Sequence, residues 1–167
     1  MNKEIFLALR DYFNMVHGIT VRALGTLSDD DLNFRPRPGM RTPRELIYHI
    51  YTQEKLLAEA AQQGRFTMEA AEASNPEGGA GAAGLKALTT VSDARAYAEA
   101  CHQAAERIFT AMPEEHLTRP VESPFGTFPA WRYFAFGYDE HWHHRGQLYT
   151  YIRLLGKEPP MLYDYGS

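Results

Sequence analysis

Cysteine is nearly absent from this chain, because Cys101 is the only one among 167 residues. A single thiol forms no intramolecular disulfide, and it cannot supply a zinc site built from several cysteines. We therefore expect a protein of a reducing compartment, the cytoplasm, in which any metal site uses other side chains. Since Cys101 stands among alanines, we interpret it as a buried apolar residue rather than a nucleophile.

Long apolar runs and dense basic clusters are also missing. No stretch approaches the roughly 18 apolar residues that a membrane span needs. The N-terminal segment carries Glu4, Arg10 and Asp11, where a secretory signal is apolar. The formal net charge is −4, and no group of lysines and arginines provides the basic surface that binds phosphates. The sequence therefore predicts no membrane span and no nucleic-acid partner.

The overall composition is that of an ordinary globular protein. Hydrophobic residues make up 44% of the chain and charged residues 23%, which excludes disordered and collagen-like classes. A chain of this length buries one sizeable core and seldom two. We expect a single domain over residues 1–167.

Apolar residues recur with helical spacing in four long stretches: about 2–27, 43–63, 92–112 and 128–155. The connections between them are rich in glycine and proline. Four helices joined by one or two long connections are typical of an all-α four-helix bundle, in which facing helices bring ligands together.

The connections carry their own expectations. Residues 72–90, rich in glycine and alanine, predict a long flexible crossover rather than another packed element. Residues 113–129 predict an extended excursion with no regular sheet. We expect Ser92 to cap the third helix and Gly156 to end the fourth.

The second helix has the clearest start. Thr42 and Glu45 form a T-x-x-E capping box, and Pro43 suits the first helical position. His49 then lies nearly two turns inside the helix, on the same stripe as Gln53. Its position is thus well fixed.

The fourth stretch contains the sequence EHWHHRGQ at residues 140–147. At 100° per residue, Glu140, His144, Gln147 and Tyr151 share one stripe, with His141 on its flank. A Glu/His pair four residues apart can chelate a metal, although the same spacing is common on ordinary solvated helices.

One imidazole from a facing helix would complete three protein donors, and His49 is the candidate. Three donors leave an open coordination position, as in catalytic metal sites. Two imidazoles and a carboxylate suit Zn²⁺, and also Ni²⁺, Fe²⁺ or Mn²⁺. We favour zinc or nickel.

Two motifs add weight to this pattern. Residues 144–148 (HRGQL), with YIRLLG at 151–156 and two prolines at 159–160, resemble the C-terminal signature of the DinB/YfiT-like family. Residues 32–36 (LNFRP) and 42–50 (TPRELIYHI) are similar to the family segment that ends in its first metal histidine. The resemblance covers essentially the whole chain, with the connections as variable regions.

This resemblance implies a four-helix bundle, a histidine-based metal site open to a cleft, and a homodimer. Family members include metal-dependent transferases that use low-molecular-weight bacterial thiols, and others known only as damage-inducible proteins.

The chain departs from the family pattern four residues before His144, where a histidine is common and Glu140 stands here. Either Glu140 is the third ligand, or His141 takes the role after a local adjustment of the helix. The i, i+4 spacing keeps both donors on one side without distortion and favours Glu140. The predicted ligands are His49, Glu140 and His144, with His141 as the alternative.

A divalent ion lowers the pKa of bound water or of a bound thiol. We therefore expect a metal-dependent thiol S-transferase or hydrolase that acts on a small electrophilic molecule. Gln147 and Tyr151 would orient ligands or substrate. The alternative is a non-catalytic stress-response protein with a binding or structural role.

The other polar residues of this region receive structural interpretations. We expect His17 and His143 to be hydrogen-bonded or exposed helical histidines, and Arg145 to make an ion pair or to donate to loop carbonyls. His102 and His116 carry no particular signal.

Overall fold

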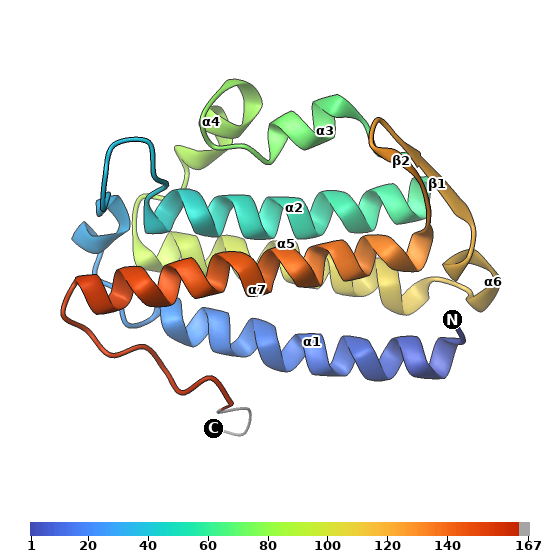
Figure 1. Ribbon diagram of the computed structural model, residues 1–167, viewed down its shortest axis with the longest axis horizontal. Coiled ribbons are helices and arrows are strands. Elements are labelled where there is room, and N and C mark those ends of the chain that lie inside the picture. The colour runs from blue at the N-terminus through green and yellow to red at the C-terminus, as the bar shows by residue number, and fades with distance from the viewer. Residues whose placement is uncertain (164–167) are drawn as a thin grey trace.

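The computed structural model describes residues 1–163, so residues 164–167 of the expected domain lie outside the described residues. The fold is mainly helical, as the periodicity predicts (Figure 1). The long helices are α1 (Lys3–Leu24), α2 (Pro43–Gln63), α5 (Val91–Ala111) and α7 (Ala130–Leu154). The short elements are the 3₁₀ helix η1 (Asp30–Asn33), α3 (Met68–Ala73), α4 (Gly79–Leu85), α6 (Glu114–Leu117), and the strands β1 (Pro120–Ser123) and β2 (Gly126–Pro129).

The four long helices run side by side along the longest dimension of the molecule (Figure 1). Helix α2 packs against both α5 and α7, and α1 packs against the same two helices from the other side. Since α2 and α7 share a long contact, side chains of their facing stripes meet. No helix within residues 1–163 is both long enough and apolar enough to cross a membrane.

The core differs between its two ends. Near the N-terminus of α1, aromatic rings meet edge to face: Phe134 contacts Phe6, Phe13 and Phe109 with centroids 5.3–5.6 Å apart. The opposite end is mainly aliphatic, with Ile50 and Leu148 fully buried. Burying such side chains supplies most of the folding free energy, at roughly 1.5–3 kcal/mol for each.

The expected boundaries hold closely for all four long helices. Helix α2 begins at Pro43 and ends at Gln63, as the capping box predicts, and α1 and α7 end within a few residues of the expected positions. The expected cap of α5 was wrong. Thr90 caps this helix, because its hydroxyl accepts from the Asp93 N–H while Asp93 accepts from the Thr90 N–H.

Two expectations for the connections were also wrong. Residues 72–90 do contain a packed element, since they include the last two residues of α3 and the whole of α4, and both helices lie over α2 (Figure 1). Residues 120–129 form a regular antiparallel hairpin, β1–β2, where no sheet was expected. This hairpin is tied to the end of α2 by two main-chain hydrogen bonds. The Glu122 carbonyl accepts from the Phe66 N–H at 2.8 Å, and the Glu122 N–H donates to the Gly64 carbonyl at 3.1 Å.

Candidate metal centre

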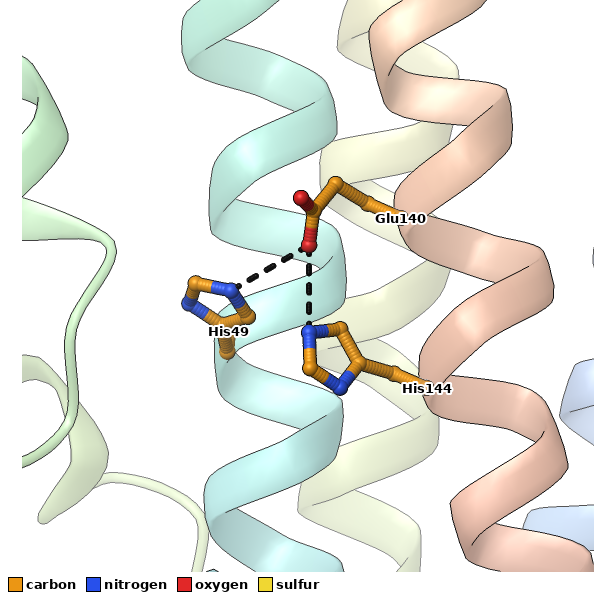
Figure 2. A group of neighbouring side chains, drawn as sticks. All are labelled: His49, Glu140 and His144. Carbon is orange, nitrogen blue, oxygen red and sulfur yellow. Dashed lines mark ion pairs between the residues drawn. The ribbon is translucent and has the colours of Figure 1, made fainter.

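His49, Glu140 and His144 meet between α2 and α7 (Figure 2). Oε2 of Glu140 lies 3.4 Å from Nε2 of His49 and 3.1 Å from Nε2 of His144. One donor atom from each residue lies within 4.8 Å of the other two. The structure thus brings together the three residues predicted from the i, i+4 pair and the facing helix.

The start of α2 fixes the position of His49 along the helix axis. The Thr42 hydroxyl accepts from the Glu45 N–H at 3.2 Å, and Glu45 accepts from the Thr42 N–H at 2.7 Å. Arg35 donates to the second oxygen of Glu45 at 2.8 Å. Both ends of the capping box are therefore satisfied, and the first turn is held against η1 and the loop that follows it.

Hydrogen bonds to the other ring nitrogens orient both imidazoles. Nδ1 of His49 lies 2.8 Å from the Ser74 carbonyl, and Nδ1 of His144 lies 2.9 Å from Oε1 of Gln147. Because both partners are acceptors, each Nδ1 carries the proton, and each neutral ring presents the lone pair of Nε2. This is the arrangement in which metal-binding histidines are held.

Three electron-rich atoms therefore converge on one point. Neutral rings and an ionised carboxylate would repel one another there unless a proton or a metal ion lies between them. When a proton rather than a metal occupies this point, Nε2 of His144, and then that of His49, donates to Glu140, and these hydrogen bonds hold the pKa of Glu140 far below its usual range, so this carboxylate stays ionised. The donor set of two imidazoles and a carboxylate fits a borderline divalent metal.

Glu140 is the most exposed of the three candidate ligands. The side chain of Glu140 is 35% exposed, whereas those of His49 and His144 are each 10% exposed. Glu140 also forms part of the wall of a cavity of about 350 Å³ between α2, α7 and the β1–β2 hairpin. A small molecule therefore has a route to the carboxylate side of the centre.

Of the two predicted accessory residues, Gln147 contacts a candidate ligand and Tyr151 packs elsewhere. Gln147 accepts from His144, as described, and its amide nitrogen lies 3.1 Å from Nε2 of His143. Tyr151 is buried with its ring edge-on to Phe34, the two centroids being 6.2 Å apart. Gln147 is thus the residue placed to orient a ligand.

The alternative ligand, His141, lies outside the group. Its side chain is fully buried, and its Nε2 lies 2.9 Å from Oε2 of Glu54. Arg145, one helical turn after His141, donates to the Val16 carbonyl of α1 at 3.2 Å, and its guanidinium packs over the Trp142 ring, 4.2 Å from the ring centroid. The expectation of a structural role for Arg145 is consistent with these contacts, although the carbonyl belongs to a helix rather than a loop.

Beside the centre lies a buried polar cluster that the sequence did not reveal. Glu54 accepts from His102 at 2.7 Å and from His141 at 2.9 Å. The ring of His17 stacks on that of His102 at 3.7 Å, and its Nδ1 accepts from the Tyr51 hydroxyl at 2.9 Å. One signal could have indicated it, because Glu54 falls on the buried face of α2, where a carboxylate requires partners.

The fold and the site together define a helical protein with a two-histidine, one-carboxylate candidate metal centre. The family model of the DinB superfamily matches residues 12–148, and the chain belongs to this superfamily. No curated protein matches it significantly.

Two solved structures share the fold. A DinB-like protein (YjoA) from Bacillus subtilis is 20% identical, with a TM-score of 0.67 over 89% of this chain and 96% of that one. A mycothiol-dependent maleylpyruvate isomerase is 18% identical, also with a TM-score of 0.67, over 89% of this chain and 61% of that one. At these identities, the likeness concerns the fold alone.

Proposed function

We propose that this protein is a metal-dependent enzyme that binds one divalent ion through His49, Glu140 and His144. One observation carries the proposal: two Nε2 atoms and a carboxylate oxygen converge while both Nδ1 atoms are already hydrogen-bonded to acceptors. Zinc or nickel suits this donor set best, and iron or manganese is also compatible with it.

The proposed reaction is the transfer of a low-molecular-weight thiol to a small electrophilic molecule, or the hydrolysis of such a molecule. A divalent ion supplies the required chemistry by lowering the pKa of a bound thiol or water. The fold shared with a mycothiol-dependent enzyme supports the thiol reaction. Three protein donors and an accessible carboxylate side leave room for the reacting molecule.

The residues of the chain have separate tasks in this proposal. Ser74 and Gln147 hold the Nδ1 protons of His49 and His144, so the two Nε2 lone pairs stay directed at the centre. Glu140 remains ionised and contributes the negative charge that partly neutralises a divalent cation. The half-exposed side of Glu140 faces the cavity through which substrate arrives.

The proposal also covers the assembly and location of the protein. We interpret the four long helices as a four-helix bundle that forms a single domain, and we propose a cytoplasmic homodimer. The apolar side chains of Ile5 and Leu9 are 55% and 43% exposed on α1, which supports a self-association surface there.

Metal analysis of the purified protein tests the centre. We expect about one equivalent of divalent metal in the wild type, and loss of most of it in His49→Ala and His144→Ala. His116→Ala is the matched control, since His116 lies on α6 away from the centre. Unchanged stoichiometry in both ligand variants would reject the site.

Activity assays then separate an enzyme from a non-catalytic binding protein. We expect the zinc- or nickel-loaded protein to accelerate either conjugation of a low-molecular-weight thiol to a chromogenic electrophile or hydrolysis of an activated ester. Whichever rate is observed should be lost when a chelator removes the metal and recovered when the metal is added back. Full metal occupancy without either activity would favour the stress-response alternative.

A further inference from the structure

The cavity beside the candidate centre has an apolar wall. Its side chains come from α2, the segment after it, the β1–β2 hairpin and α7, and five of them are Leu57, Phe66, Phe128, Tyr133 and Phe136. The rings of Phe128 and Phe136 meet edge to face at 5.3 Å, and those of Tyr133 and Phe136 at 5.6 Å. A volume of about 350 Å³ suits one or two fused rings.

The charges on this wall are all negative. Asp139 and Glu140 contribute carboxylates, and no lysine or arginine from residues 1–163 lines the cavity. The faces of aromatic rings are also electron-rich. An anionic group placed among these side chains would lose its hydration without gaining a cationic partner. The cavity therefore disfavours an anionic ring system.

Two buried polar atoms on the wall lack a hydrogen-bond partner within residues 1–163: Oε1 of Gln53 and the hydroxyl of Tyr133. Gln53 lies one turn beyond His49 on α2 and lines the cavity. Its Oε1 is buried and accepts no hydrogen bond from residues 1–163. A buried acceptor without a donor costs roughly 1–3 kcal/mol. A hydroxyl or amine of a molecule in the cavity would satisfy it.

We propose that this cavity is the substrate pocket of the centre, and that it takes an uncharged aromatic molecule whose hydroxyl or amine donates to Gln53 Oε1. The inference rests on the proposed function, because it assigns a substrate class to the same site. Phe136 contacts the aromatic ring of the substrate, and Gln53 accepts the hydrogen bond from its hydroxyl or amine. The carboxylates of Asp139 and Glu140 disfavour anionic molecules. The reacting group of the substrate lies on the Glu140 side of the pocket.

Three naphthalene probes of similar size test the proposal: 2-naphthol, 2-methoxynaphthalene and 2-naphthoate. Their affinities are measured by titration calorimetry, with and without bound zinc. Without zinc, we expect 2-naphthol to bind best. The methoxy compound should bind roughly three- to ten-fold more weakly, because it has no donor for Gln53. The naphthoate should bind roughly ten-fold more weakly or not at all.

Variants assign the binding to this pocket. In Gln53→Leu, and also in Gln53→Met, 2-naphthol should lose its advantage over the methoxy compound. Phe136→Ala should weaken binding of both probes. Leu154→Ala is the control, because Leu154 is an exposed apolar side chain at the end of α7 that does not line the cavity. Circular dichroism verifies that each variant is folded.

Several results would overturn the inference: naphthoate binding as tightly as naphthol in the zinc-free protein, an unchanged naphthol preference in both Gln53 variants, or loss of binding in Leu154→Ala. Zinc stoichiometry in the same preparations separates this inference from the proposed function. Zinc binding without the naphthol preference rejects only the pocket, whereas the naphthol preference without zinc binding rejects only the metal centre.

Discussion

Oε2 of Glu54 lies 2.9 Å from Nε2 of His141, which joins α2 to α7 close to the candidate ligands of both helices. Glu54 follows His49 by five residues, and His141 directly follows Glu140. The second oxygen of Glu54 accepts from His102 of α5. A single buried carboxylate therefore connects three of the long helices.

Replacing this carboxylate should destabilise the fold. Burial by itself raises the pKa of Glu54, but hydrogen bonds from His102 and His141 outweigh it and hold the pKa at about 2. Glu54→Gln would remove the charge and turn an amide N–H toward one imidazole. We expect a loss of roughly 3 kcal/mol in the free energy of unfolding, measured by urea denaturation.

Glu59→Gln provides the control for this prediction. Glu59 lies on the same helix and pairs with Lys55 at 3.7 Å on the surface. Such exposed pairs contribute roughly 0–1 kcal/mol. Similar losses in the two variants would mean that the buried connection adds no special stability.

The stability of the protein should fall as the pH decreases from about 6.5 to 4. Burial, and then the nearby His102, lower the pKa of His17 to about 4, although Glu99 and Glu54 act in the opposite direction. The unfolded chain therefore takes up this proton before the native state does, and protonation favours unfolding. The contribution lost over this window is roughly 2–3 kcal/mol.

Urea unfolding at several pH values measures this effect, and His17→Gln is the comparison. The variant should show a shallower fall in unfolding free energy between pH 6.5 and pH 4. Equal slopes in the two proteins would show that His17 does not cause the acid sensitivity.

Substitution of Gly81 in the crossover should lower the metal affinity of the candidate centre indirectly. A Cβ at Gly81 would collide with the Asn75 carbonyl, so Gly81→Ala must shift the turn that follows Ser74. The Ser74 carbonyl accepts from Nδ1 of His49. Since partners of metal-binding histidines contribute roughly ten-fold or more to metal affinity, we expect a loss of that size in a zinc competition assay with a chelator.

Gly78→Ala is the matched control for the crossover, because a Cβ there meets nothing within 4 Å and its φ is −167°. It should leave zinc affinity unchanged. An unaltered affinity in Gly81→Ala as well would separate the crossover from the centre.

Glu140→His should keep the metal, because it restores the residue common at this position in the family. Glu140→Ala, by contrast, should lose at least most of the bound zinc, since only two protein donors remain. Metal analysis of both variants checks this expectation. Retention of a full equivalent in Glu140→Ala would mean that another side chain, such as His141, takes the third position.

The sequence predicts the positions of the candidate ligands well because their signals are local. The capping box at Thr42 sets the start of α2 to the residue, and hence the place of His49. The i, i+4 spacing puts Glu140 and His144 on one side of α7. The contact between the two helices is not local, and the family motifs supply that expectation.

Other parts of the structure depend on partners distant in sequence. Glu54 and His102 are 48 residues apart, and no local pattern connects them. The hairpin was missed for a similar reason, since β1 bonds to residues after α2, more than 50 positions earlier in the chain. The cap of α5 was a local error, because the T-x-x-D pattern at Thr90 and Asp93 was present in the sequence.

Because the hairpin is attached to the end of α2, the candidate metal ligands and part of the pocket wall lie on different elements of the chain. The candidate ligands stand on long helices whose spacing is set by the core, whereas part of the pocket wall stands on ten residues held by main-chain hydrogen bonds at their edge. Substitutions in this short piece can remodel what the pocket admits while leaving the ligands undisturbed. Among related proteins, substitutions that change substrate specificity would then occur in the hairpin earlier than in the long helices.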